Sequence, residues 1–299
     1  MIFWRVLDNK LHPVDKVKRL GFEESDGLRM PDEYLEKQEF TVMRTCCGIG
    51  DWGIISAMPR LLKEKYPNCK VYIPSPHLME KLFNGIVTQK STWNNPFKNA
   101  NYVFENNPYV DGFKDYIVDE IFHDHYRVYD KNKKDIPLIK QMLKFWQFEE
   151  NEYIDSQPEM YWSDDEKLLG DTIIKNTIGD GEFGCLLVSD RFGTQRGKHH
   201  QESYDKDTEV MTKVLKENQI PYFYWMSKPI SQTPFNFIDK ALDMRHIDLR
   251  VQLYIKSKAK VNLSNQCGTN HLMVRYSKCY ESQRQYPISH NFVRGETYL

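Results

Sequence analysis

The sequence predicts an α/β protein of two Rossmann-like, doubly wound domains that face each other across a cleft. Three observations lead to this fold class. The 299 residues are 40% hydrophobic, which is enough for two domain-sized cores. Residues 40–74 have the pattern of a strand, a helix and a strand, and residues 185–272 repeat this alternation. Because such units build parallel sheets, we expect a ligand in the cleft, at the carboxyl ends of the strands.

The first half is predicted to consist of an N-terminal extension, residues 1–39, and a domain at residues 40–160. The extension has mixed charge and little hydrophobic periodicity, and we interpret part of it as a hairpin. In the first predicted helix of the domain, apolar residues from Ile54 to Leu62 share one face. Pro59 lies inside this helix, where a proline costs about 3 kcal/mol or bends the axis. The elements expected in this domain are strands at 40–45 and 70–74 and helices at 52–65 and 136–148.

The second half is predicted to be a separate domain, residues 161–299. The polar segment 149–157 marks the boundary, and Ser163 and Glu166 have the spacing of a helix capping box. The elements expected here are strands at 185–189, 222–226 and 260–263 and helices at 205–218, 236–242, 249–257 and from Gly268 onward. This alternation predicts a second parallel sheet covered by helices.

Charge and cysteine content narrow the class of protein. Lysine and arginine number 41 against 42 aspartate and glutamate, so the chain has no global field for nucleic acid or an anionic membrane, although a local basic groove would survive such averaging. The cysteines show no metal-knuckle spacing, and we expect free thiols in a reducing cytosol. They are Cys46, Cys47, Cys69, Cys185, Cys267 and Cys279. The apolar N-terminus meets Arg5 and Asp8 too soon for a secretory signal, and no run is long enough for a membrane span. We therefore expect a soluble, cytoplasmic protein.

The first candidate site is the small-residue loop from Cys47 to Gly53, between a predicted strand and a predicted helix. Gly48, Gly50 and Gly53 allow a ligand to approach the backbone closely, and Asp51 adds a carboxylate at the start of the helix. The alternative is that Asp51 only caps the helix, which is worth about 0.5–2 kcal/mol, and that the glycines serve the turn. The loop matches neither the dinucleotide-binding fingerprint nor the P-loop lysine motif, so both of these nucleotide loops are excluded.

The second candidate site is the polar loop at residues 189–200, directly after a predicted buried strand. Arg191, Arg196 and Lys198 concentrate positive charge that suits a phosphate. The alternative is a solvated basic loop. The two histidines of this loop are adjacent, and adjacent histidines rarely point at one ion, so we expect no metal site here.

The third candidate site is the segment 262–272, where a strand passes into a helix through another small-residue turn. Free N–H groups at Gly268, Thr269 and Asn270 would attract a phosphate, with about 0.3–1 kcal/mol from the helix dipole. The alternative is that Asn265 caps the helix and that His271 is an internal histidine with its own partners.

Several of these segments together resemble a known family. Gly48–Asp51, followed by Met58–Pro67, resembles the first motif of the heptosyltransferases, glycosyltransferase family 9, which extend lipopolysaccharide. Asn107–Asp111 is similar to the short element that follows the second strands in that family. Leu249–Lys260 and Asn265–Leu272 resemble the family's late helix, strand and donor-binding turn. The resemblance touches most of the chain after the N-terminal extension.

This resemblance implies a GT-B fold, with a nucleotide-sugar in the second domain and an acceptor against the first. It implies Asp51 as the general base of an inverting, hexosyl- or heptosyltransferase-like reaction, a role worth about 10²–10⁴ in rate. It implies no cofactor and no metal, because basic side chains and the N–H groups of the late turn would supply charge to the leaving diphosphate. The implied donor-binding residues are Arg191, Arg196, Lys198, Gln266, Gly268, Thr269 and His271, and the implied acceptor-side loop is Gly48, Gly50, Trp52 and Gly53.

One departure and two alternatives accompany this interpretation. Gln266 stands where the family usually has an acidic residue, two positions before the glycine of the donor turn, so the donor sugar need not be heptose. The expected partners are a nucleotide-sugar donor and a glycan or lipid-linked acceptor. The first alternative is a glycosyltransferase acting on hydroxymethylated bases in DNA, which a continuous basic face at the cleft mouth would favour. The second is a sugar- or nucleotide-binding module without turnover.

Overall fold

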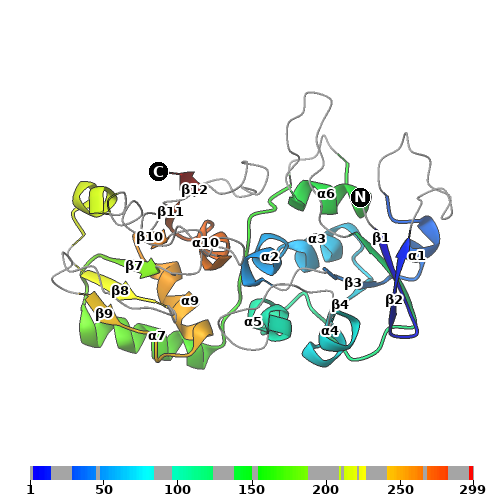
Figure 1. The fold of residues 1–299 in the computed structure, drawn as a ribbon, viewed down its shortest axis with the longest axis horizontal. Coiled ribbons are helices and arrows are strands. Elements are labelled where there is room, and N and C mark those ends of the chain that lie inside the picture. Colours follow the sequence, from blue (N-terminus) through cyan, green and yellow to red (C-terminus); the bar gives the residue numbers. More distant parts are fainter. Residues whose placement is uncertain are drawn as a thin grey trace, which may run out of the picture. The chain divides into compact units, whose positions relative to one another are not determined.

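Two parallel sheets, one in each half of the chain, organise the fold (Figure 1). The computed structural model describes residues 3–14, 29–44, 48–83, 96–123, 138–149, 154–187, 209, 212–220, 222–226, 241–264, 268–281 and 296–298. The chain divides into two compact units, of which unit 1 holds the described residues up to Tyr161 and unit 2 those from Trp162 onward. The expected mixed α/β class with parallel sheets is confirmed.

The parallel sheet of unit 1 has the strand order β3-β4-β5. Its middle strand buries Val71 and Ile73 completely, as the period of two in a strand requires when one face is covered. The strands are β3 (Glu39–Thr41), β4 (Lys70–Pro74) and β5 (Gly112–Lys114). The helices of unit 1 are α1 (Asp32–Glu36), α2 (Ile49–Ile54), α3 (Met58–Lys65), α4 (Pro76–Phe83), the 3₁₀ turn η2 (Pro96–Lys98), α5 (Asn99–Phe104) and α6 (Leu138–Phe145).

The predicted helix at residues 52–65 is wrong in one respect, because the chain forms two helices there. α2 ends at Ile54, and α3 begins at Met58 after a three-residue turn. Pro59 therefore lies in the first turn of α3, where its missing N–H would have had no partner within the helix. The expected cost of a proline inside a helix does not arise.

The N-terminal residues form a hairpin, as expected, and the hairpin belongs to a second sheet of unit 1. Strands β1 (Phe3–Leu7) and β2 (Lys10–Val14) pair antiparallel around Asp8 and Asn9, whose φ angles of 47° and 57° suit a two-residue hairpin turn. On its other edge β1 pairs antiparallel with β6 (Asp119–His123). The N-terminal strands are thus integrated into unit 1 through a strand more than 100 residues away.

Unit 2 is built on one six-stranded parallel sheet with the order β12-β11-β10-β7-β8-β9. Its strands are β7 (Phe183–Leu187), β8 (Tyr222–Trp225), β9 (Ala241–Asp243), β10 (Val261–Ser264), β11 (Lys278–Glu281) and β12 (Glu296–Tyr298). Its helices are α7 (Asp164–Thr177), α9 (Leu249–Lys258) and α10 (Gly268–Met273), and residues 212–218 are also helical. The predicted capping box of α7 is confirmed, since Ser163 and Glu166 bond each other's backbone N–H.

The predicted helix at residues 236–242 is contradicted where the structure describes it. Ala241 and Leu242 belong to β9, which pairs in parallel with β8 at the edge of the sheet. Alanine and leucine favour helices, but strand pairing in the sheet outweighs this weak local preference. Residues 236–240 lie outside the described residues.

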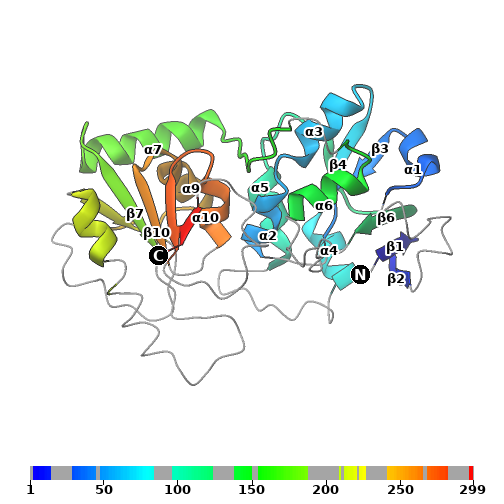
Figure 2. The ribbon, with the colours of Figure 1, turned by 90° about the horizontal axis from the view of Figure 1, so that it is seen from above.

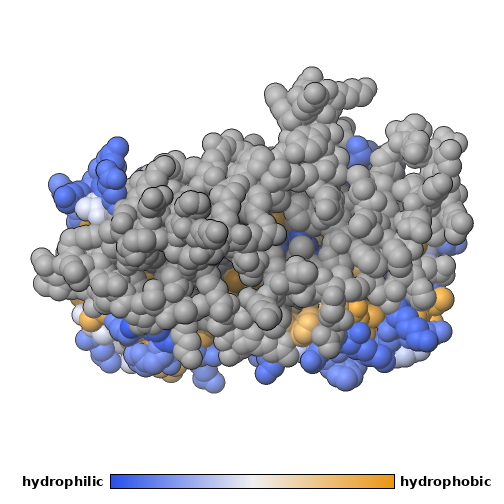
Figure 3. All heavy atoms as spheres, in the orientation of Figure 1, coloured by the Kyte–Doolittle hydropathy of each residue, from blue (hydrophilic) through white to orange (hydrophobic). Residues whose placement is uncertain are grey.

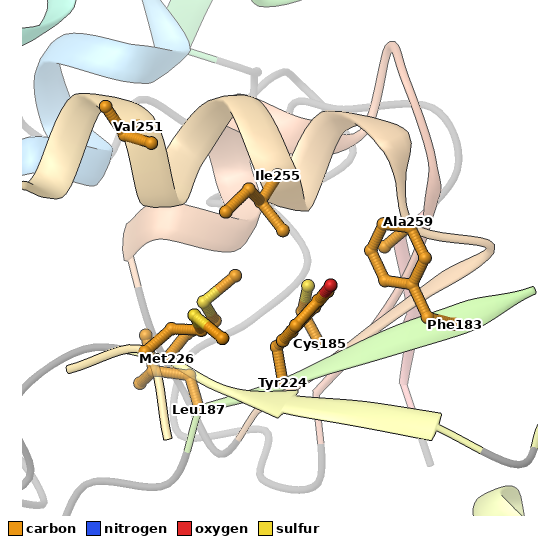
Figure 4. Packing of buried hydrophobic residues seen from close by; sticks show 9 residues of the cluster. Phe183, Cys185, Leu187, Tyr224, Met226, Val251, Ile255 and Ala259 are labelled. Carbon is orange, nitrogen blue, oxygen red and sulfur yellow. The ribbon is translucent and has the colours of Figure 1, made fainter. Parts of the chain in front are cut away.

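Helices cover both faces of the sheet of unit 2, which makes it doubly wound. Phe183, Cys185 and Leu187 face one side, where they pack against Val251 and Ile255 of α9 (Figure 4). Leu186 of β7 faces the other side, where the helical segment 212–218 covers it. This second cluster consists of Leu186, Val214, Leu215, Ile220, Val261 and Leu263. Burial on both faces is why β7 is apolar at every position.

Helices α7 and α9 lie side by side in unit 2 (Figure 2). Gly170 makes this close approach possible, because a Cβ atom at its position would lie 2.4 Å from Cδ1 of Tyr254. Tyr254 in turn donates a hydrogen bond of 2.9 Å to Asp171 and packs edge-to-face on Trp162. The aromatic ring of α9 is therefore held from several sides.

Candidate functional site

Asp51 occupies the third position of the six-residue helix α2. The N-cap of this helix is Gly48, with extended backbone angles, and no side chain caps the helix. The alternative that Asp51 is an N-cap is therefore wrong. Its carboxylate still lies in the first turn, where the helix dipole favours negative charge. With 28% of the side chain exposed, the carboxylate is accessible to a ligand.

Arg44 is the buried cation beside this carboxylate. It follows β3 after Val42 and Met43, which are both buried, and is itself 0% exposed. Its Nη1 donates a hydrogen bond to the backbone carbonyl of Asp51 and lies 3.7 Å from the carboxylate Oδ1. Its Nε and Nη2 have no hydrogen-bond partner among the residues that the structure describes. Arg44 is absent from the sequence-based site, although a basic residue at the end of an apolar strand run is a signal that could have identified it.

The remaining residues of the predicted acceptor-side loop differ in exposure. Gly48 is half-buried, whereas Gly50 and Gly53 are buried within α2. Trp52 is completely buried and packs edge-to-face on Phe104 of α5, with ring centroids 6.0 Å apart. Trp52 thus anchors α2 in the core of unit 1, and Asp51 is the side chain of this turn that remains available for chemistry.

A hydrogen-bonded network holds the far end of α2 to the last residues of unit 1. The Ser56 hydroxyl donates to the carbonyl of Gly53 at 2.7 Å and accepts from the backbone N–H of Glu159 at 2.8 Å. Glu159, which is 5% exposed, accepts from Nε of Arg60 at 2.9 Å and from the hydroxyl of Tyr161 at 3.1 Å. Desolvation and the neighbouring Glu159 raise the pKa of Tyr161. These bonds fix the helix pair behind Asp51 from a segment about 100 residues later.

Glu120 is a buried carboxyl group at the strand that leads to Arg44. It lies on β6, is 8% exposed, and accepts a 2.9 Å hydrogen bond from the backbone N–H of Thr41 at the end of β3. Desolvation raises its pKa to about 7, although the Thr41 N–H and two lysines lower it in part. Glu120 therefore provides an acceptor for a backbone N–H at the end of β3 and titrates near neutral pH.

The element Asn107–Asp111 has a structural role in unit 1. Asp111 accepts from the backbone N–H of Val71 at 2.7 Å and pairs with Nζ of Lys63 at 2.6 Å. Desolvation alone would raise the pKa of Asp111, but these two partners lower it below its ordinary value. The carboxylate thus ties α3 to the start of β4.

The third predicted site lies in unit 2, where β10 passes into α10. Gly268 and His271 are half-buried, and Thr269 is buried. Asn270, the remaining predicted N–H donor of this turn, is also completely buried. Its Nδ2 donates to Oγ of Ser264 at 2.8 Å and to the carbonyl of Tyr280 at 3.3 Å. Asn270 therefore fixes α10 onto β10 and β11.

Lys256 of α9 is a buried cation beside this turn, and no sequence pattern singles it out. It is 1% exposed, and its Nζ donates a 3.0 Å hydrogen bond to Oδ1 of Asn270. Within the described residues it forms no ion pair with a carboxylate. Burial raises the pKa of the nearby Cys185 to about 12, and Lys256 lowers it in part. The ammonium group thus lies beneath the turn and is held by a neutral amide.

The other predicted donor-binding residues, Arg191, Arg196, Lys198 and Gln266, lie outside the described residues. Of the cysteines, Cys69, Cys185 and Cys279 are free and buried, as predicted. Among the residues that the structure describes, no three His, Cys, Asp or Glu side chains are grouped so that they could hold a metal ion.

Within the described part of the chain, no helix has the length and hydropathy needed to cross a membrane. On the face in Figure 3, most of the coloured surface is hydrophilic, with smaller hydrophobic patches.

Comparison with solved structures identifies similar glycosyltransferases. A family 9 glycosyltransferase from Veillonella parvula matches with 8% identity and a TM-score of 0.49, over 87% of this chain and 84% of that chain. E. coli ADP-heptose LPS heptosyltransferase II matches with 10% identity and a TM-score of 0.36, over 84% and 72%. An E. coli heptosyltransferase with ADP-2-deoxy-2-fluoro heptose matches with 9% identity and a TM-score of 0.31, over 83% and 64%. No protein-family model and no curated protein sequence matches the chain.

Proposed function

We propose that this chain is an inverting, metal-independent glycosyltransferase that moves a sugar from a nucleotide-sugar to a hydroxyl group of a glycan or lipid-linked glycan. The observation that carries the proposal is the setting of Asp51: a partly exposed carboxylate in a helix turn that follows a parallel strand, beside the buried Arg44. Ligands of open α/β sheets bind at this end of the strands. In this proposal residues 40–160 bind the acceptor and residues 161–299 the donor.

Asp51 acts as the general base in the proposed reaction. The acceptor oxygen attacks the anomeric carbon, and its proton passes to the carboxylate of Asp51. The bond from the anomeric carbon to the diphosphate oxygen breaks on the opposite side, and its electron pair leaves with the nucleoside diphosphate. A single displacement of this kind inverts the anomeric centre.

The donor half of the reaction needs positive charge for the leaving diphosphate. We assign this role to Lys198, Arg191 and Arg196 and to the backbone N–H groups of Gly268 and Thr269. Gln266 and His271 complete the proposed donor site. Gly48, which is half-buried at the start of α2, leaves room for the acceptor beside Asp51.

Replacing Asp51 with Asn tests the proposal. The variant keeps the size of the side chain but accepts no proton, so transfer should fall by about 10²–10⁴ while the donor still binds. Asp165→Asn is a matched control, because Asp165 is an exposed carboxylate in the first turn of α7. Transfer is measured as the release of nucleoside diphosphate from each member of a panel of nucleotide-sugars. Donor binding is measured by thermal shift. Unchanged transfer in Asp51→Asn would contradict the assignment of the base.

The same panel separates the proposal from its alternatives. A bound nucleotide at a hundred times its dissociation constant should stabilise the wild-type fold by about 2.7 kcal/mol. Binding without transfer or hydrolysis would indicate a binding module. Transfer only to hydroxymethylated DNA would indicate a base-modifying enzyme. No stabilisation by any nucleoside diphosphate or nucleotide-sugar would contradict the nucleotide-sugar donor altogether.

A further inference from the structure

Among the described residues, Asp51 is the partner that the structure gives the buried guanidinium of Arg44. The guanidinium is completely buried, and a buried cation needs partners for its charge and for its N–H groups. Asp51 supplies them through its backbone carbonyl and its carboxylate. Within the described part of the chain Nε and Nη2 have no acceptor, so no saturated structural network there explains the arginine.

An apolar side chain of similar length would fill the same space without burying unpartnered donors. Because the side chain of Arg44 is completely buried, desolvation alone favours an apolar residue such as methionine at position 44. What methionine would lack is the contact from Nη1 to Asp51. The contribution that only Arg44 can make is therefore its contact with Asp51.

The contact between Arg44 and Asp51 takes the place of a side-chain cap, which α2 lacks. The helix has six residues and no side-chain cap, so its first turn is weakly held from within. The bond from Nη1 fixes the Asp51 carbonyl, and the positive charge 3.7 Å away attracts its carboxylate oxygen. Trp52 anchors the next position in the core, which leaves Arg44 to define where Asp51 itself lies.

We propose that Arg44 is a positioning residue, which holds the main chain and carboxylate of Asp51 in the orientation that receives the acceptor's proton. This inference deepens the proposed glycosyl transfer and depends on it for its catalytic consequence. It makes two separate statements about Arg44: that it orders the first turn of α2, and that it acts on the reaction only through Asp51.

The first statement is tested by hydrogen exchange and needs no activity. In Arg44→Met, amide exchange in the peptide that spans residues 48–55 should accelerate at least tenfold, and Arg44→Lys should lie between this variant and wild type. The melting temperature should stay close to that of wild type, because methionine suits the buried position. Arg245→Met, which removes a cation paired with Asp243 in unit 2, is the control and should leave the peptide unchanged. Unchanged exchange in Arg44→Met would overturn the proposal.

The second statement is tested by a double-mutant cycle on transfer activity. Arg44→Met should lower kcat about 10²-fold with little change in the KM of the donor, and Arg44→Lys should recover part of the loss. In the Asp51→Asn background the Arg44→Met change should have no further effect. An additive loss in the double variant, or weaker donor binding in the single one, would refute action through Asp51. If wild type transfers no sugar at all, the proposed function fails, and the exchange measurement still decides the positioning of Asp51.

Discussion

Each unit turns from a parallel strand into a six-residue helix beside one buried cation, but the two cations are held differently. Arg44 in unit 1 contacts a partly exposed carboxylate, and two of its nitrogens have no partner among the described residues. Lys256 in unit 2 contacts the buried amide of Asn270, whose Nδ2 is bonded elsewhere. The first arrangement directs charge at a group that is available to a ligand. The second places its charge against a buried amide inside the turn, so loss of this contact should affect the stability of the fold more than ligand binding.

The largest expected effect on stability comes from separating Lys256 from its amide. Asn270→Ala leaves the ammonium buried without its hydrogen-bond acceptor and also frees Ser264, which should cost about 3–5 kcal/mol of unfolding free energy. Lys256→Met removes the charge itself and should cost less than about 1.5 kcal/mol. Urea unfolding of both variants measures the difference. Equal costs would mean that Lys256 is not held mainly by Asn270.

Glu120 in unit 1 has a raised pKa, whereas in the described part of unit 2 the pKa values of Glu166 and Asp243 are lowered. Because the folded pKa of Glu120 is about 7 against an ordinary 4.5, the folded protein keeps a proton that the unfolded chain releases. Stability from this group is therefore highest below pH 4.5 and falls by about 3 kcal/mol as the pH rises to 7. Glu120→Gln keeps an acceptor for the Thr41 N–H without titrating. Relative to wild type, urea unfolding at pH 5 and pH 8 should show a smaller loss in the variant, and identical losses would refute the assignment.

The smallest of these effects concerns the helix pair that carries Lys256. Gly170→Ala places a methyl group against the ring of Tyr254, and the overpacking should cost about 1–3 kcal/mol, more than the roughly 1 kcal/mol gained in helix propensity. Leu169→Ala, on the exposed side of α7, is the control and should change stability by less than about 0.5 kcal/mol. A melting temperature of Gly170→Ala at or above that of wild type would show that Tyr254 moves aside at no cost.

Sequence patterns predicted the elements of unit 2 more completely than the residues that organise the two turns. Alternating apolar runs located β7, β8, β10 and α9, because burial on a sheet leaves a periodic trace in the sequence. The split between α2 and α3 and the strand β9 were missed, since local propensity does not report which backbone groups pair at a distance. Lys256 was missed for the same reason, because the sequence of a helix shows neither the burial of a lysine nor its partner. The place of Arg44 at the end of an apolar run could have marked it as a candidate, but its contact with Asp51 could not be read from the sequence.

The pairing of β1 with β6 has a consequence for the growing chain. The hairpin β1–β2 is complete once Val14 has been made, but the other edge of β1 has no partner until residues 119–123 emerge. Over that interval the strand presents unpaired N–H and C=O groups, which attract other chains. Fragments that stop before Asp119 should therefore self-associate more readily than fragments that include β6, and synthesis rate over the first 120 residues should influence the yield of native protein.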